Sequence, residues 1–229
     1  MSRKPAESVI VITGASSGIG RATALHLAGK GASLVLTARR GEALIALAEQ
    51  CERLGGRVLA LPADVTDREA VERVARGAIE RFGRIDMWVN NAAVTMFGRL
   101  EEAPYEAYRR VIETNLFGYI HGARAVVPYF REQGAGVLVN VASVVGKVGE
   151  PYLSAYVASK FGIVGFSESL RMELRDAENV HVCLVLPASI DTPLFQQGAN
   201  YMGRSPKPVE PVYRPERVAA TIARPTVPT

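Results

Sequence analysis

Two side chains with proton-transfer chemistry lie four residues apart in this sequence. Tyr156 and Lys160 fall within a predicted helix, where this spacing places both on one face. A free tyrosine has a pKa of about 10, too high for a base at neutral pH, but a nearby ammonium group favours the phenolate. Lowering that pKa by about two units requires only about 3 kcal/mol. The pair predicts acid/base chemistry, although such pairs are more often ordinary amphipathic ones.

Two further polar residues could complete such a site. Ser143 follows a predicted strand, 13 residues before Tyr156, and its hydroxyl could donate to a substrate oxygen as negative charge develops there. Asn115 lies in a long predicted helix, where its side chain could hold a water molecule next to Lys160. Together with the pair, these residues form a candidate catalytic group.

A glycine-rich run follows the first predicted strand and leads into a helix. The run is Thr13, Gly14, Ala15, Ser16, Ser17, Gly18, Ile19 and Gly20. Glycines allow a tight turn and a close approach of the backbone to a pyrophosphate, and a helix N-terminus directs free N–H groups at phosphates. In this position the run predicts a dinucleotide site, whereas alone it could be a turn and a helix cap.

The end of the second predicted strand bears on which dinucleotide is bound. A carboxylate at this position would bind the 2′-hydroxyl of an NAD ribose, but the sequence has Arg39 and Arg40 there. Guanidinium groups suit a phosphate, so NADP, and NADPH over NADH, is the expected cofactor. The alternative is that both arginines are solvated residues at the start of the next helix.

Residues after the third and fourth predicted strands are further candidates for the nucleotide site. Asp64 and Val65 could receive the adenine, but Asp64 or Asp67 could equally cap the next helix. Asn91 and Ala92 follow the fourth strand, at the edge where doubly wound sheets bind ligands.

Short apolar segments alternate with longer amphipathic ones along the chain. Uninterrupted Val, Ile and Leu are typical of parallel strands covered by helices on both faces. The predicted strands span residues 8–13, 33–38, 57–61, 87–89, 136–142 and 180–186, and the predicted helices lie near 18–30, 41–54, 67–82, 104–131 and 152–177. Repeated strand–helix–strand units predict a doubly wound α/β fold, with residues 1–229 as one domain.

Composition and charge exclude several classes of function. The net charge of +4 comes from 27 basic and 23 acidic residues without a basic run, so nucleic acid is not an expected partner. Cys51 and Cys183 fit no metal-ligand spacing and predict two reduced thiols, no metal site and a cytoplasmic location. The sequence shows no signal peptide and no apolar stretch of about 18 residues, so no membrane span is expected.

Together, these motifs resemble the short-chain dehydrogenase/reductase family over about residues 8–195. The matching elements, in order and spacing, are residues 13–20, N-N-A-A at 90–93, Asn115, Ser143 and Y-V-A-S-K at 156–160. The resemblance implies a Rossmann-type domain that binds a nicotinamide dinucleotide. It assigns Asn115 to a proton relay, Ser143 to substrate polarisation, Tyr156 to acid/base transfer, and Lys160 to ribose binding and lowering of the tyrosine pKa.

The segment after the sixth strand matches the family in part. Members usually have Pro-Gly there and a threonine that holds the nicotinamide carboxamide. Pro187 and Thr192 fit this pattern, but Ala188 stands where glycine is usual and restricts the turn. Ala93 likewise replaces a common glycine in the fourth-strand motif.

The C-terminal part departs further from the family. From Gly198 to Pro215 glycine and proline are dense, which predicts an excursion with a short helix, and we expect a substrate lid at about residues 188–214. Members normally carry a last helix and a seventh strand, but Pro225 and Pro228 argue against a central strand here. Either the terminus is truncated or further residues follow, so the last strand is expected to be missing from this sequence.

The lid residues leave the substrate open. Four large apolar side chains lie in this segment: Leu194, Phe195, Tyr201 and Met202. They could form an apolar pocket that closes over a lipid-like or ring-containing substrate. Equally, they could serve only to pack the lid onto the body of the protein.

The main hypothesis is an NADP(H)-dependent oxidoreductase that transfers hydride between the cofactor and a carbonyl or alcohol substrate. The alternative is a catalytically inactive, NADP(H)-binding redox sensor, which the complete set of four catalytic positions disfavours. An epimerase or dehydratase is disfavoured because the chain lacks a larger substrate domain. By analogy with the family we expect a homodimer or homotetramer joined through the helices near 104–131 and 152–177.

Overall fold

A computed structural model of the protein describes residues 4–224. Its central element is a parallel sheet of six strands in the order β3-β2-β1-β4-β6-β7. The strands are β1 (Val9–Thr13), β2 (Ser33–Thr37), β3 (Arg57–Ala60), β4 (Met87–Asn90), β6 (Gly136–Val141) and β7 (Val180–Val185). All six were predicted, and each differs from its predicted range by one residue. The doubly wound, Rossmann-type fold is thereby confirmed, with the order reversing between β1 and β4.

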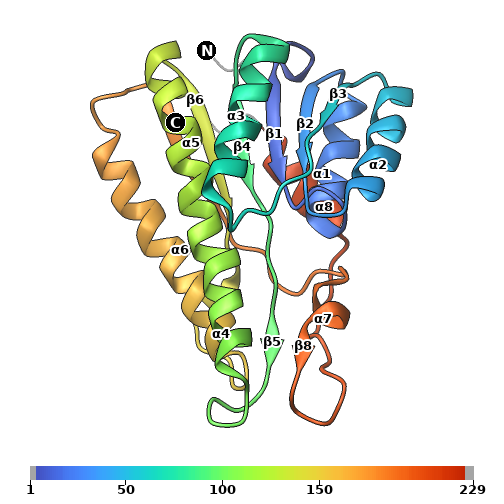
Figure 1. The fold of residues 1–229 in the computed structure, drawn as a ribbon, viewed down its shortest axis with the longest axis vertical. Coiled ribbons are helices and arrows are strands. Elements are labelled where there is room, and N and C mark those ends of the chain that lie inside the picture. Colours follow the sequence, from blue (N-terminus) through green and yellow to red (C-terminus); the bar gives the residue numbers. More distant parts are fainter. Residues whose placement is uncertain (1–3, 225–229) are drawn as a thin grey trace.

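Helices cover both faces of the sheet (Figure 1). One face packs against α1 (Gly18–Ala28), α2 (Gly41–Arg53) and α8 (Pro215–Ile222). The other face packs against α3 (Arg68–Phe82), α5 (Gly118–Gln133) and α6 (Ser154–Glu173). Every residue of β1 and β2 is buried, as the uninterrupted apolar runs predicted. The sheet is therefore a rigid platform whose strands end at one common edge.

The long helix predicted near 104–131 is not continuous. It consists of α4 (Tyr105–Ile112), a π-helical turn η2 (Glu113–Phe117) and α5. A π-turn inserts an extra residue into the helix and often occurs at functional sites. Here it contains the fully buried Asn115. The π-turn therefore lies at Asn115, a residue that the sequence predicts to be part of the catalytic group.

A smaller assembly lies beyond the edge of the large sheet (Figure 1). Strands β5 (Met96–Phe97) and β8 (Ala199–Asn200) form a parallel pair, preceded by the short helix α7 (Leu194–Gln197). The backbone N–H of Ala199 donates to the Thr95 carbonyl at 3.2 Å, and that of Tyr201 donates to the Phe97 carbonyl at 2.8 Å. The C-terminal segment is thus fastened to the chain that follows β4.

The C-terminal part differs from the prediction in two ways. The short helix was expected within residues 198–215, but α7 ends at Gln197 because the next residues pair with β5 instead. The last helix, which the sequence did not reveal, is present as α8 and starts with Pro215, whose fixed φ suits the first helical position. The expectation about Pro225 and Pro228 lies outside the described residues.

Two short 3₁₀ turns complete the elements: η1 (Pro5–Glu7) and η3 (Val144–Gly146).

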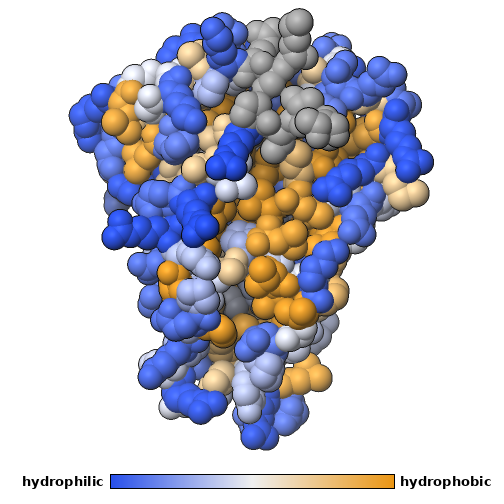
Figure 2. Space-filling view, turned by 180° about the vertical axis from the view of Figure 1, so that it is seen from behind, coloured by the Kyte–Doolittle hydropathy of each residue, from blue (hydrophilic) through white to orange (hydrophobic). Residues whose placement is uncertain are grey.

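Figure 2 shows apolar side chains gathered near the middle of the face turned away in Figure 1, surrounded mainly by hydrophilic ones. Within residues 4–224 no helix combines the length and apolar character that a membrane crossing needs.

Cys51 and Cys183 are both free. Burial raises the pKa of the Cys51 thiol to about 11, which makes that thiol unreactive at neutral pH.

Candidate active site

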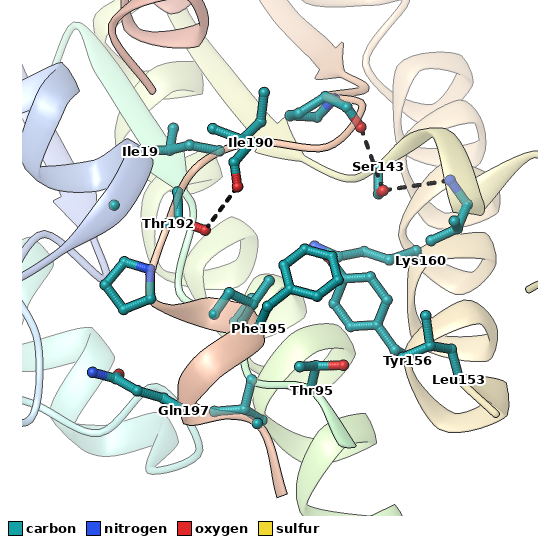
Figure 3. A pocket seen from close by; sticks show the side chains of 18 of the residues that line it. Ile19, Thr95, Ser143, Leu153, Tyr156, Lys160, Ile190, Thr192, Phe195 and Gln197 are labelled. Atoms are coloured by element: carbon teal, nitrogen blue, oxygen red, sulfur yellow. Dashed lines mark hydrogen bonds between the residues drawn. The ribbon is translucent and has the colours of Figure 1, made fainter. Parts of the chain in front are cut away.

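One large cavity of ≈ 1120 Å³ lies at the carboxyl ends of the strands. Its wall includes the glycine-rich turn, the ends of β2, β4 and β6, residues of α6, and the segment around α7. Figure 3 shows Tyr156 and Lys160 reaching into it from α6 and Phe195 from the side of α7. The edge of a doubly wound sheet where the strand order reverses is the usual ligand-binding position in this architecture.

The glycine-rich turn forms one end of this cavity. Gly14 has a φ of 63°, and a Cβ on it would lie 2.6 Å from the Cα of Ala92, so only glycine fits. Helix α1 starts at Gly18 and has no side-chain cap, which leaves its first N–H groups available to a ligand. Ser16, Ser17 and Ile19 also line the cavity. These features suit a bound phosphate.

Asn91 and Ala92, which follow β4, have a structural use. The Thr13 hydroxyl accepts from the backbone N–H groups of Asn91 at 2.9 Å and Ala92 at 3.1 Å. The Asn91 side-chain amide donates to the carbonyls of Thr13 at 3.0 Å and Gly14 at 3.2 Å. Both residues border the cavity, but the Asn91 side chain holds the glycine-rich turn in place. Any contribution of Asn91 to nucleotide binding would therefore be largely indirect.

Arg39 and Arg40 lie at the predicted position, exposed at the rim of the cavity. The Arg40 guanidinium donates to the Ser16 hydroxyl at 3.1 Å and so joins the end of β2 to the glycine-rich turn. Both arginines precede the first turn of α2, where a positive charge gains nothing from the helix dipole. Their placement beside a cavity suits an anionic ligand better than it suits the helix.

The alternatives for the carboxylates after β3 can now be separated. Asp67 caps α3 by accepting from the Ala70 N–H at 3.1 Å. Asp64 accepts from Thr66 and from the Arg110 guanidinium, the latter at 2.7 Å, and lines the cavity with Val65. Burial opposes ionisation of Asp64, but the Thr66 and Arg110 hydrogen bonds outweigh it and lower its pKa. Asp64 is therefore an anchored carboxylate in the wall of the cavity.

Ser143 and Tyr156 face the opposite end of the cavity. Ser143 is the N-cap of η3. Besides its hydrogen bond with Tyr156, its hydroxyl makes two long contacts of 3.4 Å, one as donor to the Pro187 carbonyl and one as acceptor from the Val145 N–H (Figure 3). Such weak contacts leave the hydroxyl free to turn toward a ligand. Tyr156 packs against Met96 and Ala155 and presents its phenol to the same space.

Lys160 is buried, with 2% of its surface exposed. Its ammonium group donates to the Val141 carbonyl at 2.9 Å and lies 5.3 Å from the centroid of the Tyr156 ring. The spacing of four residues on α6 therefore brings the lysine and the tyrosine together, as predicted. Burial lowers the pKa of Lys160 to about 7.

The predicted effect on the tyrosine is not what the protein alone produces. Burial raises the pKa of Tyr156 above its ordinary value, and the hydrogen bond with Ser143 offsets only part of that rise. The prediction from the sequence took Lys160 as fully charged in a partly desolvated cleft, whereas burial removes part of its charge at neutral pH. Without a ligand, Tyr156 is therefore a protonated phenol at neutral pH, suited to donating a proton.

Asn115 is buried close to the pair but is oriented differently from the expectation. Its side-chain oxygen accepts from the Val94 N–H at 2.9 Å, and its amide donates to the Val94 carbonyl at 2.9 Å and the Ser159 hydroxyl at 3.1 Å. These three bonds tie η2 to the segment after β4 and to α6. The side chain is thus engaged with protein atoms instead of pointing at Lys160.

The segment after β7 adopts the turn that the sequence had left in question. Ala188 avoids the left-handed region of φ, so a glycine is not required there. Pro187 and Thr192 line the cavity, and the Thr192 hydroxyl makes only one long contact, 3.5 Å to the Ile190 carbonyl. A Cβ on Gly18 would lie 3.1 Å from the Thr192 methyl group. Gly18 therefore lets this segment approach the start of α1.

Several residues in the cavity wall or just behind it were not identified from the sequence. Phe97 of β5 stacks with Phe195 at 5.9 Å between ring centroids, and both line the cavity. Thr95 is 6% exposed, and its buried hydroxyl has no hydrogen-bond partner. Tyr119 is fully buried beside Lys160, with its ring centroid 5.4 Å from the ammonium nitrogen. Its position four residues after Asn115 on a predicted helix was the one available indication.

Comparison with known proteins identifies the family. The family model described as short chain dehydrogenase matches residues 8–201, and the chain belongs to this family. An uncharacterized oxidoreductase, YxnA of Bacillus subtilis, is 42% identical over 223 residues, which cover 96% of this chain and 63% of YxnA. The chain thus spans less than two thirds of the length of that relative.

Solved structures agree with this assignment. An alcohol dehydrogenase from the archaeon Thermococcus sibiricus, complexed with 5-hydroxy-NADP, has a TM-score of 0.84 and 31% identity, with coverage of 94% of this chain and 88% of that one. Levodione reductase also has a TM-score of 0.84 and 31% identity, with coverage of 96% and 90%. The predicted family and fold are therefore confirmed.

Proposed function

We propose that this protein is an NADP(H)-dependent oxidoreductase that reduces a carbonyl group to an alcohol, with the reverse oxidation under suitable conditions. The observation that carries the proposal is that Ser143, Tyr156 and Lys160 share one cavity with an uncapped helix N-terminus and a glycine-rich turn. A bound nicotinamide dinucleotide would supply the hydride. The inactive redox sensor is the weaker alternative, because such a protein would not need this group of side chains.

The side chains divide the proton chemistry among them. The Tyr156 phenol donates its proton to the substrate oxygen, and the raised pKa of this phenol keeps it protonated at neutral pH. Ser143 donates a hydrogen bond to the same oxygen and stabilises its developing charge. Lys160 stabilises the phenolate that remains, since its ammonium lies 5.3 Å from the ring centroid. Asn115 supports this arrangement by fixing η2 against α6.

The preference for NADP(H) rests on two arginines. Arg39 and Arg40 border the cavity at the end of β2, where the sequence supplies no carboxylate for an unphosphorylated ribose. The similar Thermococcus sibiricus enzyme carries a derivative of NADP. At the other end, Pro187 and Thr192 would contact the nicotinamide, while Asp64 and Val65 would border the adenine.

The substrate side of the cavity favours an apolar ring. The stacked Phe97 and Phe195 form an aromatic wall, and residues 188–214 act as a lid that is fastened to β5 through β8. The names of two similar proteins, levodione reductase and a cyclohexanol dehydrogenase of Acinetobacter, point to cyclic substrates. We therefore propose cyclic ketones as the substrate class.

A second copy of the chain is the proposed macromolecular partner. Large apolar side chains are exposed on the helices that were expected to form a contact: Tyr105, Phe117, Phe161 and Met172. Isolated exposed apolar residues are common, but four on the neighbouring elements α4, η2 and α6 suit an interface. Light scattering at micromolar concentration should give a dimer or tetramer, and a monomeric mass would refute this part of the proposal.

An enzyme assay tests the proposed function directly. Purified protein with NADPH should consume the near-ultraviolet absorbance of the cofactor in the presence of cyclic ketones, and more slowly with short linear ketones. NADH should be a poorer cofactor than NADPH. Tight binding of NADPH without turnover on any ketone, aldehyde or quinone would instead favour the redox sensor.

A further inference from the structure

Tyr119 shares a hydrogen-bond acceptor with the catalytic lysine. It lies in the first turn of α5 and is 1% exposed. Its phenol donates to the Val141 carbonyl at 2.9 Å, and the Lys160 ammonium donates to that same carbonyl at 2.9 Å. A carbonyl oxygen has two lone pairs, so these two donors fill it. The position of one side chain therefore constrains the position of the other.

The Tyr119 ring also faces the ammonium group. The Lys160 nitrogen lies over the ring at 5.4 Å from its centroid and over the Tyr156 ring at 5.3 Å. Both distances are within the range of about 6 Å in which a ring face attracts a cation. Among the described residues no carboxylate forms an ion pair with Lys160, and burial is the one cause of its lowered pKa. The two rings and one carbonyl are thus its main stabilising contacts.

The groups around Lys160 can be assigned to the elements that pack against it. Helix α6 contributes Tyr156, α5 contributes Tyr119, and β6 contributes the uncharged Val141 carbonyl. The neighbouring turns η2 and η3 add the neutral Asn115 and no ionisable side chain. Glu113, also in η2, instead forms its ion pair with Arg109. Within residues 4–224, Tyr119 is therefore the one titratable group that another element places at the ammonium.

The backbone of Tyr119 is held as firmly as its phenol. Its carbonyl accepts from the Asn90 side-chain amide at 3.0 Å. Asn90 in turn donates to Asn140 at 2.9 Å and accepts from Trp88 at 2.8 Å, all within the core. A tyrosine that only filled the core would need any one acceptor. Tyr119 is instead held by Asn90 at its backbone, and its phenol bonds the same carbonyl as the lysine.

We propose that Tyr119 is a positioning residue that holds the Lys160 ammonium in place through its ring face and through the shared Val141 carbonyl. The proposal rests on the proposed function, because Lys160 must act in that reaction. Carbonyl reduction requires a charged Lys160, so the alkaline limb of the pH profile for kcat/KM reports the loss of its proton. A purely structural role for Tyr119 would leave this limb unchanged.

Two substitutions separate the ring from its oxygen. Y119F keeps the ring but frees one lone pair of the Val141 carbonyl, which strengthens the ammonium bond and should move the alkaline limb up by about 0.3 pH unit. Y119L lacks the oxygen and the ring. The alkaline limb of Y119L should lie about 0.5 pH unit or more below that of Y119F, and its kcat/KM should be about tenfold below wild type.

A matched control accounts for lost packing. F130L removes an equally buried ring from the same helix, where Phe130 belongs to a different core cluster. It should lower the melting temperature and leave the pH limb unchanged. The proposal is overturned if the alkaline limbs of the kcat/KM profiles of wild type, Y119F and Y119L coincide within about 0.2 pH unit. If Y119L does not fold, Y119F against wild type decides alone, and an inactive wild type would instead refute the proposed function.

Discussion

The two ends of the cavity are built by different means. At the nucleotide end, the glycine-rich turn and Thr13 are local in sequence, and the backbone itself supplies the binding groups. At the substrate end, β5 and β8 come from segments about a hundred residues apart and are joined by backbone hydrogen bonds. The first end depends on backbone geometry, and the second depends on how two distant segments pack. Substitutions should therefore act separately on cofactor and substrate.

The largest effect is expected at Gly14. In G14A the new Cβ would lie 2.6 Å from the Ala92 Cα, at a φ of 63° that alanine rarely adopts, so the turn must open. The loss of two or more hydrogen bonds to a charged phosphate predicts an affinity for NADPH that is lower by about 100-fold or more. Titration calorimetry measures this. G29A, just beyond the C-terminal end of α1, is the control, and equal affinity for NADPH in the two variants would contradict this prediction.

Removal of the two arginines should affect the choice of cofactor. Charge-assisted hydrogen bonds are worth about 1.5–3 kcal/mol, so R39A/R40A should raise the KM for NADPH by about 10- to 100-fold. The KM for NADH should change by less than about threefold, because NADH lacks the 2′-phosphate. Steady-state kinetics with both cofactors gives the ratio. A parallel loss with NADPH and NADH would mean that the arginines serve the turn instead of the phosphate.

A smaller effect is expected at the lid. A Cβ on Gly198 would lie 2.7 Å from the Thr95 methyl group and 2.9 Å from the Phe97 ring, so G198A should push β8 away from β5. Overpacking costs about 1–3 kcal/mol, which predicts a KM for the ketone that is about tenfold higher. The affinity for NADPH should stay within twofold. G165A, where a Cβ meets nothing within 4 Å, should change neither constant.

The smallest effect concerns the stability of the protein without cofactor. The pKa of Lys160 falls from 10.5 to about 7 on folding, so between these values the unfolded chain binds more protons and stability rises with pH. The penalty is complete below about pH 7 and is relieved towards pH 10.5. K160M removes it, so its melting temperature should exceed that of wild type by about 10 °C at pH 6, and by less at pH 9. Calorimetry at both pH values checks the sign, and a constant difference would contradict it.

The sequence predicted the large sheet more completely than the small strand pair of β5 and β8. Every strand of the large sheet was located within one residue, because strands buried on both faces leave uninterrupted apolar runs. The strands β5 and β8 have two residues each, which is too short to leave an apolar run. Their existence depends on contacts between distant segments, which local patterns do not contain.

The site residues divide in a similar way. Spacing correctly brought Tyr156 and Lys160 together, because four residues on a helix fix their relative position. Spacing could not show that Asn115 would turn towards Val94, since that orientation depends on the π-turn. Nor could it reveal Tyr119, which in sequence is one more aromatic residue in a helix. The raised pKa of Tyr156 in the protein without a ligand was also missed, because burial is a property of the whole fold.

Replacement of Tyr156 by phenylalanine tests the central claim most directly. Y156F removes one oxygen and leaves the aromatic ring in place. General acid catalysis contributes about 10²–10⁴-fold, so kcat for ketone reduction should fall by about 10³-fold, while the dissociation constant for NADPH stays within threefold of wild type. A Y156F enzyme that binds NADPH and retains kcat within tenfold of wild type would contradict the assignment of Tyr156 as the proton donor.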